Sequence, residues 1–186
     1  MSVPANLTPK NNRATARAAL KRLVLGAVLA SMSVVIGMFC KSFLNFGGGL
    51  WRITFENLPI ILAGIFLGPL TGGMVGLVSD LTSYLLSPQI YPPNLIVTFG
   101  ALTVGAVSGL MAKFVVREHN VKQIIVSASA AHILGSMIIK PIGLYQFYHW
   151  AVLVRIPLYL VIAPLEIFLL CMLWKQKSFR KLFDKL

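Results

Sequence analysis

Acidic side chains are scarce in this sequence, which has five Asp and Glu against 17 Lys and Arg among 186 residues. Three of them, Glu56, Asp80 and Glu166, lie in or beside apolar segments, and three are too few for a self-contained proton relay. Only two cysteines are present, Cys40 and Cys171, and their spacing supports neither a metal site nor a structural disulfide. We therefore expect no metal centre, and we interpret both cysteines as apolar packing residues.

The motifs of common enzyme classes are also absent. The chain has no Walker A loop, no H-E-x-x-H sequence, no G-x-S-x-G sequence and no pair of carboxylates at a useful helical spacing. We therefore expect a protein that is not an enzyme and that holds no cofactor. If it moves a solute, the energy must come from an ion gradient or from another subunit.

Polar residues are too few to cover the surface of a soluble globule. Hydrophobic residues make up 57% of the chain and charged residues 12%, and the mean hydropathy is +0.80. The sequence therefore predicts an integral membrane protein. A net charge of +12 would suggest nucleic acid for a soluble protein, but these cations stand between apolar segments, where they orient helices in a lipid bilayer. We expect no nucleic-acid partner.

Six apolar segments predict an all-α membrane protein, a compact bundle of six transmembrane helices. A helix needs about 20 residues to cross a bilayer, and the second and third segments are shorter because Gly68-Pro69 divides them. Asn57 is expected to cap the second helix, and Pro141 with Gly143 to end the fifth. The predicted segments are 23–39, a second that starts near Asn57 and stops at the Gly68-Pro69 break, 72–86, 94–115, 121–139 and 151–174.

The distribution of cations predicts the orientation in the membrane. A mobile basic N-terminal tail (1–16) is expected before the six-helix transmembrane domain (17–174), and a basic cytoplasmic tail (175–186) after it. Six crossings place both termini on one side, and 13 of the 17 cations fall there with the turn between the fourth and fifth helices, so this side is cytoplasmic. The other four cations, at or near the opposite face, are Lys41, Arg52, Lys140 and Arg155.

Polar and aromatic residues gather on the outer half of the predicted bundle. Ionisable groups inside a membrane are costly unless they are paired or hydrated, so they often mark a binding site. Other interpretations stay open: tyrosines and tryptophans also anchor proteins at the interface, Lys140 and Arg155 are long enough to reach lipid headgroups, and Asp80 is able to pair internally. His132 is expected to be a satisfied polar residue between helices. The substrate-binding candidates are Arg52, Glu56, Asp80, Tyr84, Tyr91, Asn94, Lys140, Tyr145, Trp150 and Arg155.

Small residues recur at helical spacing in two places. Glycines at 64, 68, 72 and 76 fall four apart, a series that allows a neighbouring backbone to approach closely. In the first predicted helix, small side chains share one face, which is able to pack within the protein or against a partner helix. These residues are Gly26, Ala27, Ala30 and Ser31.

These motifs together resemble a known family. The small face of the first helix, the run Arg52-Ile-Thr-Phe-Glu-Asn-Leu-Pro, and the series from Gly68-Pro69 through Gly72 and Gly76 to Asp80 look like the substrate-binding S components of energy-coupling factor vitamin transporters. The resemblance extends over nearly the whole chain from Ala16 onward. The R-x-T-F entry and the aromatic-proline run at 91–93 look most like the folate-specific members.

The resemblance implies a small helical bundle in a prokaryotic cell membrane that captures a vitamin, here folate, on its extracytoplasmic side. It implies a transmembrane coupling subunit and two ATPase subunits as partners, with Gly26, Ala27, Ala30 and Ser31 as candidates for the partner contact. The alternatives are an S component for riboflavin, thiamine or pantothenate, a stand-alone secondary transporter, and a purely structural membrane subunit.

Folate chemistry fits the candidate residues. A flat pterin and an aromatic linker need aromatic surfaces, the pterin edge needs a carboxylate or an amide, and the two carboxylates of the glutamate tail need cations. The sequence offers Tyr84, Tyr91, Tyr145 and Trp150 for stacking, Glu56, Asp80 and Asn94 for the edge, and Arg52, Lys140 and Arg155 for the tail.

Overall fold

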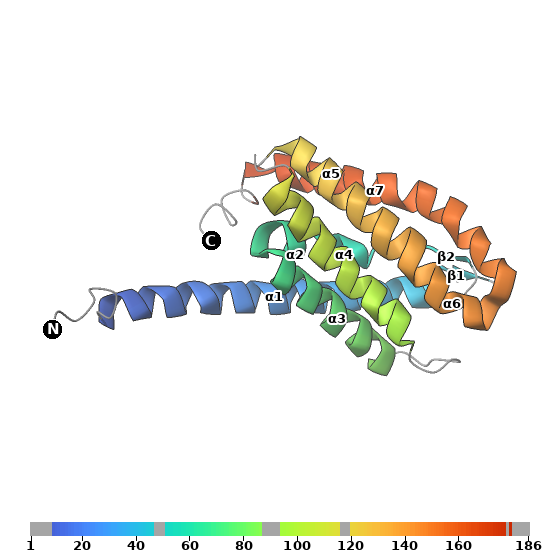
Figure 1. Ribbon diagram of the computed structural model, residues 1–186, viewed down its shortest axis with the longest axis horizontal. Coiled ribbons are helices and arrows are strands. Elements are labelled where there is room, and N and C mark those ends of the chain that lie inside the picture. The colour runs from blue at the N-terminus through green and yellow to red at the C-terminus, as the bar shows by residue number, and fades with distance from the viewer. Residues whose placement is uncertain (1–8, 47–50, 87–93, 116–119, 178, 180–186) are drawn as a thin grey trace.

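The computed structural model describes residues 9–46, 51–86, 94–115, 120–177 and 179, and helices make up most of it (Figure 1). A two-residue hairpin of β1 (Asn45–Phe46) and β2 (Trp51–Arg52) follows the first helix. The helices are α1 (Pro9–Phe43), α2 (Asn57–Leu67), α3 (Pro69–Leu86), α4 (Leu95–Phe114), α5 (Val121–Ala131), the π-helix η2 (His132–Ile139), α6 (Lys140–Tyr148), the 3-10 helix η3 (His149–Val154) and α7 (Arg155–Lys175).

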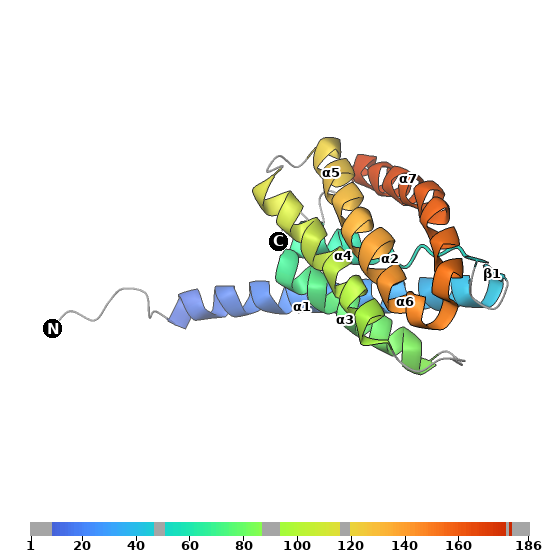
Figure 2. The same cartoon turned by 45° about the vertical axis from the view of Figure 1, so that its right-hand side comes forward.

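Helix α1 is the longest element, and its N-terminal end projects beyond the other helices in both views (Figures 1 and 2). Its 35 residues correspond to about 52 Å of helix. The helix begins at Pro9, inside the segment that we expected to be a tail, because proline is favoured in the first helical turn and an alanine-rich sequence follows. Residues 1–8 of the expected tail lie outside the described residues, as do 178 and 180–186 of the C-terminal one.

Helix α2 forms the centre of the bundle. Ten of its 11 residues are buried, and it contacts α1, α3, α4, α5 and α7. The apolar sequence Ile60-Ile61-Leu62-Ala63 is therefore covered on every side. The helix ends where Gly68 adopts a positive φ of 97°, a conformation that glycine allows without strain, and Pro69 opens α3. The two short segments predicted on either side of Gly68-Pro69 therefore pack against each other.

Close backbone contact joins α2, α3 and α4, as the glycine series predicts. A Cβ atom added to Gly72 would lie 2.6 Å from the carbonyl oxygen of Gly105 and would also overlap the backbone of Gly64. A Cβ atom on Gly76 would overlap the carbonyl of Ala101. The prediction of a small-residue packing face is confirmed, and it fixes α3 tightly against α4.

The fifth apolar segment does not end at Pro141, so that prediction was wrong. Helix α6 continues to Tyr148, with Pro141 in its first turn. The reason is the π-helix before it: the N–H of Lys140 already bonds to the carbonyl of Gly135, five residues earlier, so the missing N–H of Pro141 interrupts no regular ladder. The chain turns at His149, which has a positive φ of 48°, before η3 and α7 return along the bundle (Figure 1).

Within the described residues, three continuous helical stretches are long and apolar enough to cross a membrane: Thr15–Phe43, Leu95–Phe114 and Val121–Lys175. Helix α2 is apolar but shorter. Large apolar side chains are exposed on the outside of the bundle, among them Val161 and Phe168 of α7, as expected of a surface that faces lipid. The chain is a helical membrane protein, as composition predicts.

The ends of the helices separate into two groups along the long axis of the molecule (Figure 1). The N-terminal end of α1, the C-terminal end of α7 and the facing ends of α4 and α5 lie toward one end. The β1–β2 hairpin, the junction of α6 with η3, and the facing ends of α3 and α4 lie toward the other. This second end carries the polar residues of the candidate site.

Candidate binding site

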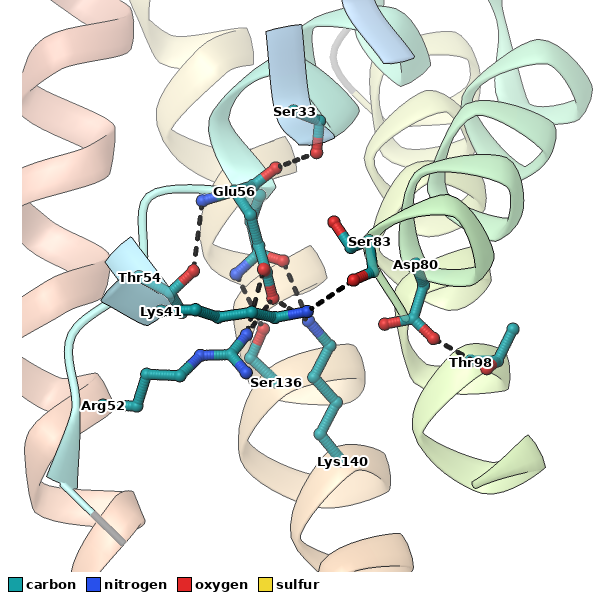
Figure 3. Close-up of polar contacts among 11 residues, drawn as sticks. Ser33, Lys41, Arg52, Thr54, Glu56, Asp80, Ser83, Thr98, Ser136 and Lys140 are labelled. Atoms are coloured by element: carbon teal, nitrogen blue, oxygen red, sulfur yellow. Dashed lines mark hydrogen bonds and ion pairs between the residues drawn. The ribbon is translucent and has the colours of Figure 1, made fainter. Parts of the chain in front are cut away.

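Five charged side chains from separate elements meet near the end of α1, and we call them the polar cluster (Figure 3). Lys41 comes from the last turn of α1, Arg52 from β2, Glu56 from the residue before α2, Asp80 from α3 and Lys140 from the start of α6. The pairing of Arg52 with Asn45 in the hairpin holds β2 beside the end of α1. Four of these residues were predicted site residues, and the fold brings them together.

Glu56 lies at the centre of the polar cluster. Nη2 of Arg52 donates hydrogen bonds to both carboxylate oxygens of Glu56, at 2.9 and 3.0 Å, and Nζ of Lys140 lies 3.6 Å from Oε1. The backbone of Glu56 is also held, because Ser33 donates to its carbonyl at 2.7 Å. A Cβ atom on Gly37 would lie 2.9 Å from Oε2, so the glycine leaves room for this carboxylate.

Two opposing effects determine the pKa of the Glu56 carboxyl group. Burial by itself raises the pKa of the carboxyl group, but Arg52, Lys140 and Lys41 lower it by more, and the result is a pKa of about 2. Burial likewise lowers the pKa of Arg52, yet Glu56 and the other anionic groups nearby raise it above its ordinary value. Glu56 is therefore ionised across the physiological pH range.

Lys140 is buried and held from α2. Its Nζ donates to Oδ1 of Asn57 at 3.1 Å, and Nδ2 of Asn57 donates to Oγ of Ser136 at 3.4 Å. A Cβ atom on Gly100 would lie 2.8 Å from Cγ of Lys140, so α4 leaves space for the lysine stem. The prediction that Asn57 caps α2 was wrong: Glu56 occupies the N-cap position, and the Asn57 amide binds a buried ammonium group that needs an acceptor.

Two further contacts extend the polar cluster toward α3 and α4. Nζ of Lys41 donates to the carbonyl of Ser83 at 3.1 Å, and Oγ1 of Thr98 donates to Oδ2 of Asp80 at 2.7 Å. Asp80 therefore has an internal partner, one of the interpretations left open by the sequence, although the partner is a hydroxyl and not a cation. Lys41 was not among the predicted binding residues. The sequence feature that could have identified it is its predicted position on the face opposite to the one where most cations lie.

The remaining predicted polar residues of this region differ in their surroundings. The side chain of Asn94 caps α4 by accepting from the N–H groups of Ile96 and Val97, and it donates to the carbonyl of Gly143. Its polar atoms are therefore used by the backbone. Tyr84 is half-buried on α3. Tyr91 lies outside the described residues.

Aromatic residues form a rim beside the junction of α6, η3 and α7. The rings of Tyr145 and Trp150 meet edge to face at 5.7 Å, and Trp150 is 73% exposed. The guanidinium of Arg155 lies 5.5 Å from the ring centre of Tyr148, a cation–π distance. An apolar groove of about 470 Å³ runs along this junction and is lined by Met137, Ile138, Pro141, Ile142, Tyr145, Val152, Leu153 and Ile156.

A second buried polar pair lies deeper in the bundle. Nε2 of His132 and Oε2 of Glu166 are 3.0 Å apart, and both side chains are almost completely buried. His132 therefore lies between the π-helix η2 and α7, as expected, but among the described residues neither of its ring nitrogens has a hydrogen-bond partner, so the expectation that it is satisfied is not confirmed. Among the described residues, no group of three or more His, Cys, Asp or Glu side chains is placed to hold a metal ion.

The small residues of α1 divide between two environments. Gly26 and Ala30 are buried: a Cβ atom on Gly26 would touch Thr71 and Val75, and the carbonyl of Ala30 accepts a hydrogen bond from Ser79. Ala27 and Ser31 are exposed, and the Ser31 hydroxyl donates to the carbonyl of Ala27. Half of the predicted contact face thus packs inside this chain, against α3.

The polar cluster has the chemical groups that an anionic or polar ligand requires. The two bonds of Arg52 to Glu56 both use Nη2. The cluster has cations and a hydroxyl group close together, its carboxylates are engaged by the cations and by Thr98, and Arg155 lies over the ring of Tyr148. This arrangement serves recognition by charge-assisted hydrogen bonds and stacking.

Comparisons with known proteins agree with a transport role. The family described as "ECF transporter, substrate-specific component" matches residues 21–183. A search of curated proteins finds no match. The solved structure titled "Crystal structure of FolT bound with folic acid" is similar in fold, with a TM-score of 0.65 and 23% sequence identity, over 83% of this chain and 93% of that chain. Because the family match extends over most of the sequence, the chain belongs to the substrate-specific components of ECF transporters.

Proposed function

We propose that this substrate-specific component captures folate at the end of the bundle that carries the polar cluster. The observation that carries the proposal is the balance of charge there. Four cations, Lys41, Arg52, Lys140 and Arg155, accompany the two carboxylates Glu56 and Asp80, since Arg155 lies within electrostatic range of Arg52 and Glu56. Two positive charges remain, and folate presents two carboxylates on its glutamate tail.

Aromatic surfaces beside these cations suit the flat part of the ligand. Tyr145 and Trp150 form the rim, and the apolar groove between η2, α6, η3 and α7 opens next to them. Asp80, and with it Tyr84 one turn further along α3, would face the pterin edge. The similarity in fold to a protein solved with folic acid supports the same ligand class.

The proposed orientation follows from the cations and from the two groups of helix ends. Helices α1, α2, α3, α4, α5 with α6, and α7 would make six crossings, with both termini cytoplasmic and the polar cluster extracytoplasmic. The membrane in this proposal is a prokaryotic cell membrane.

Delivery of the vitamin needs a transmembrane coupling subunit and two ATPase subunits, because this chain carries no ATPase motif. Ala27 and Ser31, exposed on α1, are the proposed contacts with the coupling subunit.

Calorimetric titration of the detergent-purified protein tests the ligand. Folate should bind in the nanomolar range, about −12 kcal/mol, whereas riboflavin, thiamine and pantothenate should not bind. Tight binding of one of these three would retain the family and discard folate. Absence of binding to all four, in protein shown to be folded by size-exclusion chromatography, would contradict a capture role for the isolated chain.

A further inference from the structure

Glu56 differs from the other candidate residues because cations of the protein surround it and already balance its negative charge without a ligand. Arg52 binds both of its carboxylate oxygens, Lys140 lies 3.6 Å away, and its side chain is only 13% exposed. Its backbone N–H donates to Oγ1 of Thr54 at 3.3 Å, and its carbonyl accepts from Ser33. These contacts hold the carboxylate in place from both sides, so a ligand meets it as a fixed negative charge.

The cations around Glu56 are also fixed, each by a different element. Lys41 is bound to the carbonyl of Ser83 on α3, and Lys140 to the amide of Asn57 on α2. These bonds hold both ammonium groups near Glu56. Glu166 lies deeper in the bundle, where its Oε2 is 3.0 Å from Nε2 of His132. The charge that an incoming ligand meets is thus determined by a small set of side chains with known positions.

We propose that Glu56 is a specificity-determining residue that selects ligands by their number of carboxylates. This inference rests on the proposed function, and it assigns Glu56 to the internal charge balance instead of to contact with the pterin edge. With Glu56 ionised, the site has two uncompensated positive charges and matches a dianion. Without it, the site has three and favours a ligand with one more carboxylate.

Three pteridine ligands of different charge test this inference by calorimetric titration: pteroic acid with one carboxylate, folic acid with two, and pteroyl-diglutamic acid with three. The wild-type protein should bind folic acid most tightly. The Glu56→Gln variant should raise the affinity for the three-carboxylate ligand relative to folic acid by about tenfold. Glu56→Asp keeps the charge, and its ligand preference should remain that of the wild type even if all affinities fall.

Two further variants separate charge from structure. Lys41→Gln removes one cation and should shift the preference in the opposite direction, toward pteroic acid, and it tests the same charge balance if Glu56→Gln does not fold. Glu166→Gln makes the same chemical change inside the bundle and should leave the preference unchanged. An unchanged preference in Glu56→Gln, or an equal shift in Glu56→Asp, would overturn the inference while folate capture stands. A wild-type protein that binds none of the three ligands overturns the proposed function and this inference with it.

Discussion

Replacement of Arg52 by alanine is the most direct test of the polar cluster. The substitution removes the guanidinium that binds both oxygens of Glu56, and it leaves that carboxylate with Lys140 at 3.6 Å as its nearest cation. It also removes a cation that we propose for binding a folate carboxylate. Both the stability of the empty protein and its affinity for folate should therefore fall.

The two effects have different sizes. A charge-assisted hydrogen bond contributes about 1.5–3 kcal/mol, so the dissociation constant for folate should rise roughly 10- to 150-fold. Loss of one partner of a fully buried ion pair costs about 3–5 kcal/mol. The Arg52 side chain is 23% exposed, and Lys140 remains beside Glu56, so the cost to folding should be smaller, about 1–2 kcal/mol.

Calorimetric titration with folic acid measures the first effect, and thermal unfolding of the ligand-free protein measures the second. Arg52→Lys is the matched variant: it keeps the positive charge but loses the planar, two-pronged geometry, so its affinity should fall between those of the wild type and Arg52→Ala. Unchanged affinity in folded Arg52→Ala protein would remove Arg52 from the binding site and refute the reasoning.

Three more predictions concern stability. Because the pKa of Glu56 is lowered, its ion pairs stabilise the fold by on the order of 3 kcal/mol above about pH 4.5. This contribution is lost as the pH falls toward 2. The Glu56→Gln variant should therefore lose less stability than the wild type over this pH range in acid unfolding. Gly72→Ala should destabilise the protein by about 1–3 kcal/mol or more because its methyl group would meet backbone atoms, whereas Gly73→Ala should be tolerated because the nearest atoms lie 3.6 Å away, a difference that thermal unfolding measures. His132→Ala should cost about 3–5 kcal/mol, measured in the same way, because it leaves the buried Glu166 carboxyl without its partner.

Each of these has a result that would contradict it. An acid-unfolding curve of Glu56→Gln that matches the wild type would mean that the neighbouring cations do not lower the pKa of Glu56. Equal stability of the two glycine variants would mean that the contact between α3 and α4 is looser than the structure has it. A His132→Ala variant as stable as the wild type would mean that the buried pair with Glu166 adds nothing to folding.

The expected helices were mostly recovered because each rests on a local signal. The apolar run before Gly68 and the proline after it placed the break between α2 and α3 at the right residues. The continuation of the helix across Pro141 was not predicted, because it depends on the π-helix η2 at 132–139. The sequence contains no recognisable pattern for that π-helix. The role of Asn57 was missed for a similar reason, since its partner Lys140 is 83 residues away.

By itself, the sequence determined the membrane environment and the positions of most helices. It also identified the charged groups that would be costly to place next to lipid. These follow from hydropathy, helix length and the cost of burying charge, which are properties of short segments. Only the tertiary structure decided which charges meet. Arg52 and Glu56 are close in sequence, but Lys41 and Lys140 lie near them only because the fold brings the C-terminal end of α1 together with the starts of α2 and α6 (Figure 3).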